Sequence, residues 1–301
     1  MRIALAATPE VGIPTLEWLQ SSEHELVAVI TQPDRPAGRG RTLTATPVAV
    51  WAHAQSLPLH KTDSVTDLLS IARSVDLLIT IGYGVMLPAD VLSAPRFGCI
   101  NLHFSLLPSW RGAAPVQRSI EAGDSFTGVT VFAMDEGMDT GPIYTQMRYA
   151  LDQDITADEL FVELSHLGVS AIEESLALIS QGKKPTPQKE SGVSRAFKLS
   201  KAEGSIDWNN SAEEVSAKIR AFTSNPGAWT TINETVLKID SVSISDEVLS
   251  PGEISLTPSS VHIGTATNAL LIEGVTPAGK SHMKAADWAR GARLSPGAIC
   301  G

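Results

Sequence analysis

The stretch CINLHFSLLPSWRG, residues 99–112, leads a short apolar run into two polar side chains and then into a leucine-proline turn. Short, nearly continuous apolar runs are typical of parallel strands covered on both faces. The same pattern occurs three times earlier, at 2–6, 26–31 and 76–81. We expect helices between these runs, near 13–20, 46–56, 66–73 and 112–121. The alternation predicts an α/β domain with an open, mainly parallel sheet.

Two further apolar segments follow that stretch, at 128–134 and 142–150, with only a loop between them. They are predicted to form an antiparallel addition at one edge of the sheet. The clearest helix is expected over 155–182. Thr156 and Glu159 have the spacing of a capping box at its start, and Gly182 is a suitable stop.

The composition changes after this helix. Residues 184–204 are rich in Lys, Pro, Ser and Gly, with five Lys and Arg against two Asp and Glu. A linker is predicted there, between a catalytic domain at 1–183 and a second domain at 205–301. The second domain opens with a helix capped by Ser211 and Glu214. Short strands separated by turn residues follow it, which predicts a small β-barrel or sandwich.

The overall composition excludes several classes of protein. The 301 residues suit two domains, and no apolar run reaches the length of a membrane-spanning helix. The N-terminal segment is expected to form a first strand rather than a signal peptide. Two cysteines give no disulfide framework, so a reducing cytoplasm is the expected compartment. The net charge of −10 is unlike that of a general nucleic-acid binder, so any RNA contact must use local basic patches.

Asn101 and His103 are the first candidates for chemistry. They are two residues apart, so a strand places both on one face. They also come where the apolar run ends, which is where open α/β sheets bind ligands. An amide donor beside a histidine acid/base suits a carbonyl that must become a tetrahedral oxyanion. A capping Asn with a structural His explains the pair alone equally well.

Three other segments could complete a site. Asp139 lies in a glycine-flanked loop, where a carboxylate could orient His103 and favour its imidazolium form. Spacing does not show that the two meet, and Asp139 taken alone reads as a turn residue. The turn SLLP at 105–108 and the segment GYG at 82–84 could wall a flat ligand, or be ordinary turns.

A long arginine-rich connection follows the second strand. It spans 31–47 and contains Arg35, Arg39 and Arg41, which could reach phosphate or RNA or could form a solvated loop. Common nucleotide, hydrolase and metal motifs are absent: there is no G-x-G-x-x-G after the first strand, no Walker loop, no G-x-S-x-G, no CxxC and no HExxH. No metal site is therefore expected. Cys99 is expected to pack in the core.

Taken together, these segments resemble the methionyl-tRNA formyltransferase family over nearly the whole chain. The resemblance rests on TQPDRPAGRG, GYGVMLP, GCINLHFSLLPSWRGAAPVQRSI, GDSFTGVTVFAMDEGMDTGPIY, KLSKAEGSIDW, RAFTSNPGAW and LLIEGVTPAGKSHM. The Asn-x-His, SLLP and Asp set is shared by folate-dependent formyltransferases. The arginine loop and the second domain indicate the tRNA enzymes. Phe104 is a departure, since many relatives have Gly or Pro there.

The resemblance implies a Rossmann-like first domain, a C-terminal β-barrel of OB type that binds tRNA, and formyl transfer from 10-formyltetrahydrofolate to methionine on charged initiator tRNA. It implies that a monomer acts with these two partners and without a membrane. The implied catalytic residues are Asn101, His103 and Asp139. The implied folate-binding residues are Ser105, Leu106, Leu107, Pro108, Gly82, Tyr83 and Gly84. The implied tRNA-binding residues are Arg35, Arg39, Arg41, Lys198 and Lys201.

Other functions share the same catalytic trio. A formyltransferase for an amino-sugar nucleotide or for glycinamide ribonucleotide would differ only in its substrate elements, and the arginine loop with the KLSK linker favours tRNA. A formyltetrahydrofolate hydrolase would use water as the acceptor and would not need that loop. A non-catalytic folate-binding or RNA-binding protein would not require an oxyanion donor together with an acid/base pair.

Overall fold

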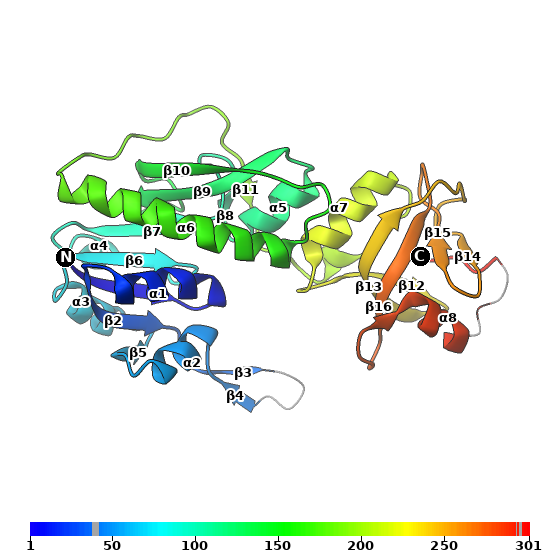
Figure 1. Ribbon diagram of the computed structural model, residues 1–301, viewed down its shortest axis with the longest axis horizontal. Helices are drawn as coiled ribbons and strands as arrows, with labels where there is room; N and C mark the ends of the chain where they lie inside the picture. Colours follow the sequence, from blue (N-terminus) through cyan, green and yellow to red (C-terminus); the bar gives the residue numbers. More distant parts are fainter. Residues whose placement is uncertain (38–41, 293, 295–296) are drawn as a thin grey trace. The chain divides into compact units, whose positions relative to one another are not determined.

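The computed structural model describes residues 1–37, 42–292, 294 and 297–301 (Figure 1). The chain divides into two compact units. The first comprises Met1–Pro115, Phe126–Ala150 and Phe161–Ala196, and the second comprises Val116–Ser125, Leu151–Leu160 and Phe197–Gly301. The predicted linker at 184–204 thus contributes to both units. None of the helices in the described ranges is long and apolar enough to cross a membrane.

The first unit is built on a seven-stranded sheet. Its strands are β1 (Arg2–Ala7), β2 (Glu25–Thr31), β5 (Leu59–Lys61), β6 (Leu77–Ile81), β7 (Cys99–His103), β9 (Phe126–Ala133) and β10 (Ile143–Ala150). They lie in the order β10-β9-β7-β6-β1-β2-β5. The five strands from β7 to β5 are parallel, whereas β9 runs antiparallel to β7 and to β10. This arrangement confirms the mainly parallel sheet and its antiparallel edge.

Helices connect the strands and cover both faces of the sheet. They are α1 (Ile13–Ser21), which follows the 3-10 turn η1 (Glu10–Gly12), then α2 (Pro47–Ala54), α3 (Val65–Ala72), α4 (Ala89–Leu92) and α6 (Ala157–Ser180). The short helix α5 (Pro115–Glu121) belongs almost entirely to the second unit. On one face, Leu68 of α3 and Val91 of α4 pack with Cys99 in a buried apolar cluster. On the other face, Gly168 of α6 lies against the side chain of Leu102. Cys99 and Leu102 are three residues apart on β7, so the alternation of side chains along a strand directs them to opposite faces of the sheet.

The edge strand β5 and two short ladders were not expected from the sequence. In the arginine-rich connection, β3 (Arg35–Ala37) pairs antiparallel with β4 (Thr42–Thr44). Elsewhere, β8 (Arg111–Gly112) pairs in parallel with β11 (Arg195–Ala196), which belongs to the predicted linker. Strands of two or three residues are too short to show a hydrophobic period, so sequence patterning does not detect them.

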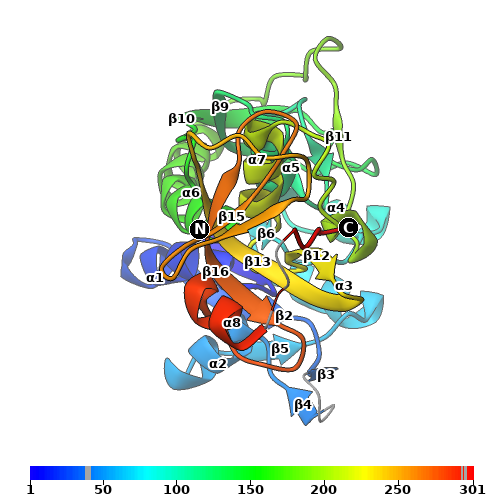
Figure 2. The same ribbon diagram turned by 90° about the vertical axis from the view of Figure 1, so that its right-hand side faces the viewer.

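The second unit contains an antiparallel half-barrel sheet (Figure 2). Its strands are β12 (Ala228–Ile232), β13 (Thr235–Ile244), β14 (Ile254–Leu256), β15 (Val261–Ile263), β16 (Leu270–Pro277) and β17 (Met283–Lys284). The same unit holds η2 (Ala202–Gly204), α7 (Ala212–Phe222) and α8 (Ala285–Ala292). Ser211 and Glu214 form the expected capping box of α7. The small C-terminal β domain is confirmed.

Candidate active site

The sheet register places Asn101 beside Thr80. Parallel pairing of β6 with β7 sets the two residues opposite each other near the carboxyl ends of their strands. The Thr80 hydroxyl donates a hydrogen bond of 2.7 Å to Oδ1 of Asn101. Since the amide oxygen is engaged as an acceptor, the amide NH₂ of Asn101 is left as a donor for a ligand.

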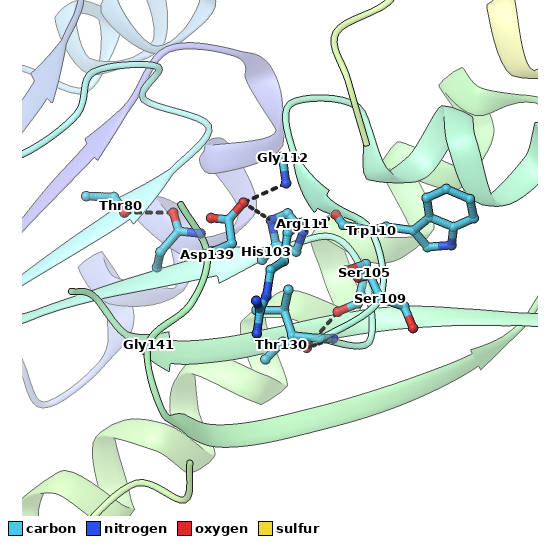
Figure 3. Close-up of polar contacts among 12 residues, drawn as sticks. Thr80, His103, Ser105, Ser109, Trp110, Arg111, Gly112, Thr130, Asp139 and Gly141 are labelled. Carbon is cyan, nitrogen blue, oxygen red and sulfur yellow. Dashed lines mark hydrogen bonds and ion pairs between the residues drawn. The ribbon is translucent and has the colours of Figure 1, made fainter. Parts of the chain in front are cut away.

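His103 ends β7 on the same face, and only 5% of its surface is exposed. Its Nε2 lies 2.9 Å from the backbone carbonyl of Trp110, and its Nδ1 lies 3.8 Å from Oδ2 of Asp139 (Figure 3). A carbonyl only accepts, so Nε2 carries the proton in the neutral ring and Nδ1 presents a lone pair. Nδ1 is therefore the nitrogen that can take up a proton.

Burial controls the protonation of His103. Desolvation lowers the pKa of the ring below its ordinary value, while the Asp139 carboxylate and the Trp110 carbonyl act in the opposite direction. The ring is therefore neutral near pH 7. The imidazolium that the sequence suggested is a form that Asp139 can stabilise after a proton has arrived.

Asp139 is held in an unusual backbone conformation. Its φ is +55°, a left-handed value that Asp and Asn tolerate better than most residues. Its Oδ2 accepts a hydrogen bond of 2.8 Å from the Gly112 N–H while facing the His103 ring (Figure 3). The sequence left open whether Asp139 and His103 meet, and the structure brings them together.

The SLLP turn is held by side chains of two strands, Thr130 on β9 and Gln146 on β10. The Thr130 hydroxyl donates to the Ser105 carbonyl at 2.6 Å and accepts from the Leu107 N–H at 3.1 Å. Nε2 of Gln146 donates to the Leu107 carbonyl at 2.7 Å. Ser105 and Leu107 are buried, whereas Leu106 and Pro108 remain partly accessible. The turn is thus rigidly held and presents an apolar surface.

Phe104, where many relatives have Gly or Pro, is accommodated beside this turn. Phe104 is buried and contacts Phe161 of α6 edge-to-face, with ring centroids 6.0 Å apart. Such pairs are favourable beyond the area they bury. Phe104 connects β7 to the SLLP turn, and its buried side chain therefore anchors this connection in the core.

The GYG segment contributes backbone rather than side chain. Gly82 and Gly84 have positive φ values of 57° and 77°. The ring of Tyr83 packs in the core, its hydroxyl donates to the Thr62 carbonyl, and burial raises its pKa to about 12. The Tyr83 carbonyl accepts from Gln32 at 2.7 Å. A ligand at this segment would meet main-chain atoms, because the phenol is already engaged.

The described residues that are expected to meet tRNA belong to both units. Arg35 is exposed and lies 3.8 Å from Asp63, and the expectations for Arg39 and Arg41 fall outside the described residues. Lys198 and Lys201 are exposed in the second unit.

Several residues that build the site were missed by the sequence analysis. Thr80 and Thr130 lie opposite Asn101 and His103 in the strand register, so a correct strand alignment could have found them. Gln188 and its partner Arg111 gave no signal, because their contacts join segments far apart in the chain. Within the described residues, no group of three or more His, Cys, Asp or Glu side chains could hold a metal ion.

Comparisons with known proteins match both parts of the chain. The formyl transferase family model matches residues 1–176, and the model of the formyl transferase C-terminal domain matches residues 198–293. The methionyl-tRNA formyltransferase of Rhodococcus erythropolis is 42% identical over 300 residues, covering 98% of each chain. That of Mycobacteroides abscessus is 41% identical over 302 residues, also covering 98% of each chain.

Solved structures share the fold at low identity. HypX from Aquifex aeolicus, in complex with tetrahydrofolic acid, has a TM-score of 0.70 at 19% identity, over 95% of this chain and 46% of that one. An N-formyltransferase from Helicobacter canadensis, in complex with folinic acid and dTDP-3-aminofucose, has a TM-score of 0.69 at 17% identity, over 90% and 98%. At such identity the likeness concerns the fold alone.

Proposed function

The chain belongs to the methionyl-tRNA formyltransferase family, and we propose that Asn101, His103 and Asp139 carry out its reaction. The protein transfers the formyl group of 10-formyltetrahydrofolate to the amino group of methionine on initiator tRNA. A carbon–nitrogen bond forms between the amine and the formyl carbon, and the bond from that carbon to N10 of the folate breaks. One proton must pass from the attacking amine to the departing nitrogen.

Asn101 stabilises the charge that develops on the formyl oxygen. Attack converts the carbonyl into a tetrahedral oxyanion, and a donor fixed in advance lowers the energy of that state more than the energy of the bound substrate. The hydrogen bond from Thr80 to Oδ1 supports this role, since it orients the amide before the substrate arrives.

His103 carries the proton. The ring is buried and neutral, and its Nδ1 lone pair faces Asp139 at 3.8 Å. Protonation at Nδ1 creates an imidazolium beside a carboxylate, which compensates the charge in a poorly solvated site. The same nitrogen can then pass the proton to N10. This His103–Asp139 pairing is the single observation that carries the proposal.

The SLLP turn and the GYG segment receive the folate. The accessible surfaces of Leu106 and Pro108 suit the face of a flat donor molecule, and the carbonyl and N–H groups of the turn are held by Thr130 and Gln146. Ser105 donates its hydroxyl to the Ser109 carbonyl at 2.6 Å, so it maintains the turn. A turn held by β9 and β10 keeps the folate donor correctly placed relative to Asn101.

We assign the tRNA contacts to the arginine loop, the linker and the second unit. Arg35, Arg39, Arg41, Lys198 and Lys201 are local cations on a chain of net charge −10. Each phosphate neutralised releases counterions, so tRNA binding should weaken steeply as salt rises. A salt-independent affinity would contradict this assignment.

A monomer is the expected working form, since one chain supplies all three proposed catalytic residues, Asn101, His103 and Asp139. The cytoplasm is the expected compartment. Both cysteines are buried free thiols, which suits a reducing environment.

A formyl-transfer assay with three acceptors tests the substrate assignment. The enzyme receives 10-formyltetrahydrofolate with methionine-charged initiator tRNA, with the same tRNA uncharged, or with an amino-sugar nucleotide. We expect transfer to the charged tRNA alone. Transfer to the sugar, or release of formate without an acceptor, would overturn the acceptor assignment while leaving the trio's chemistry in place.

A further inference from the structure

The first half of the predicted linker runs alongside the active-site loops. Thr186 exchanges two backbone hydrogen bonds with Ile143, of 2.7 and 2.8 Å, just beyond the Asp139 loop. The Ser194 carbonyl then accepts from the Arg111 N–H at 2.9 Å, and the Ala196 carbonyl accepts from the Ala113 N–H at 2.8 Å. This segment is therefore tied both to the loop that carries Asp139 and to the loop that contains Gly112.

Gln188 lies between these two attachments and bonds to both loops. Its Nε2 donates to the carbonyl of Asp139 at 2.9 Å and to the carbonyl of Gly141 at 2.8 Å. Its Oε1 accepts from Nε and Nη2 of Arg111, at 3.1 and 2.6 Å. The full hydrogen-bonding capacity of the amide NH₂ is thus used on the backbone of the Asp139 loop.

The Asp139 loop needs such a restraint. Asp139 has a positive φ, and a Cβ on Gly141 would come within 1.8 Å of the Ala133 carbonyl oxygen, so the loop follows a narrow path. The gap of 3.8 Å between Oδ2 of Asp139 and Nδ1 of His103 depends on that path. Figure 3 shows the Gly112 N–H donating to Asp139. Arg111 and Gly112 are neighbours in sequence, so the Gln188–Arg111 bond also holds the backbone that makes this contact.

We propose that Gln188 is a positioning residue for catalysis: it fixes the backbone of the Asp139 loop so that the carboxylate faces His103. It touches neither the folate nor the methionyl group and acts through Asp139. The inference rests on the proposed role of Asp139. It gives the first half of the linker a part in the chemistry, separate from any contact with RNA.

Two substitutions separate this role from simple support of the fold. Gln188→Glu keeps an acceptor for Arg111 but replaces the NH₂ donor with an oxygen that faces two carbonyls. Gln188→Ala removes both functions. Small displacements of catalytic groups are costly, so we expect kcat to fall about tenfold in both variants. KM for the folate and for charged tRNA should change less than twofold. Gln181→Ala, at an exposed site after α6, is the matched control and should behave as wild type.

A double-mutant cycle with Asp139→Asn tests the route of the effect. Asn suits the left-handed conformation at this position, so the backbone is preserved while the carboxylate is lost. If Gln188 acts through that carboxylate, adding Gln188→Ala to Asp139→Asn should lower the single-turnover rate by less than twofold. Thermal melting verifies that each variant is folded.

Three results would overturn the inference. The first is wild-type kcat in both Gln188 variants while Asp139→Asn is impaired. The second is loss of activity in Gln188→Ala with full activity in Gln188→Glu, which would make Gln188 a partner of Arg111 only. The third is an undiminished tenfold effect in the Asp139→Asn background. Normal activity of Asp139→Asn alone would instead refute the proposed function of Asp139.

Discussion

The two sides of the active site are held in different ways. Asn101 and His103 lie on β7, where pairing with β6 and β9 fixes their positions and sets Thr80 opposite Asn101. Asp139 lies in a loop outside the sheet ladders, in a left-handed conformation, and is held by hydrogen bonds from Gly112 and Gln188. One side inherits its geometry from the sheet, and the other obtains it from segments distant in sequence.

This difference separates two requirements of the reaction. An oxyanion donor must be in place before charge develops, and a central strand of a packed sheet provides a rigid support for it. The Asp139 carboxylate must lie at a suitable distance from Nδ1 of His103 to stabilise a proton there, and the contacts of its loop set that distance. Substitutions on the sheet side should therefore remove a direct interaction, whereas those that loosen the loop side should act through His103.

The largest effect is expected from the sheet side. Asn101→Ala removes the amide donor, and loss of one oxyanion donor typically lowers kcat by about 10²–10³. KM for both substrates should change little, because the donor acts on the transition state. Single-turnover formyl transfer measures the loss, and circular dichroism checks the fold. Near-normal turnover of the folded variant would remove Asn101 from the mechanism.

The contribution of Asp139 should be visible in the dependence of the reaction rate on pH. Burial keeps the pKa of His103 below about 6.5, so protonation of the ring should slow the reaction only below that value, about tenfold per pH unit. Asp139→Asn removes a charge that raises this pKa, so the acid limb should move to still lower pH. The methionyl amine titrates equally in both enzymes, which assigns the difference to His103. Superimposable profiles would argue against the pairing.

Arg39 is a proposed tRNA contact, and its replacement should affect binding of tRNA rather than the chemical step. Arg39→Ala should raise KM for charged tRNA about tenfold, as expected for one lost charge-assisted contact, and should spare the affinity for folate. The dependence of tRNA binding on salt should also become shallower by about one counterion. Fluorescence titrations with charged tRNA and with folate measure the two affinities separately. Equal damage to both substrates would place Arg39 in the fold or in the folate site.

The smallest effect is expected when the hydrogen bond from Thr80 to Asn101 is removed. Thr80→Val keeps the shape of the side chain and removes the hydroxyl that donates to Oδ1. One hydrogen bond is worth about 1 kcal/mol, so kcat should fall about fivefold. Thr80→Ser, which retains the hydroxyl, should restore most of the rate. A Thr80→Ser variant as slow as Thr80→Val would show that packing, and not the hydrogen bond, matters at this position.

Much of the sheet side could be predicted from the sequence. The apolar runs predicted four of the five parallel strands and missed only the short β5. The two-residue spacing of Asn101 and His103 placed them on one face at a strand end. A register error of one residue would have turned both side chains away, so the hydrophobic pattern constrains their direction strongly. Thr80 lay within reach of the same reasoning, because it follows from aligning β6 with β7.

The loop side could not be predicted in the same way. The link between Asp139 and Gln188 spans 49 positions in sequence and joins two segments without any hydrophobic period. The linker was recognised by its basic composition, which says nothing about backbone pairing with Ile143 or Arg111. Its ladder, β8 with β11, is only two residues long. Such contacts depend on the folded chain, and local propensity does not encode them.

The titration of His103 by nuclear magnetic resonance tests the central claim most directly. The measurement follows the ring nitrogens in the wild type and in Asp139→Asn. The account predicts a neutral ring protonated at Nε2, a pKa below about 6.5 in the wild type, and a still lower pKa in the variant. A wild-type pKa at or above that value, or a pKa that does not change without the carboxylate, would contradict it.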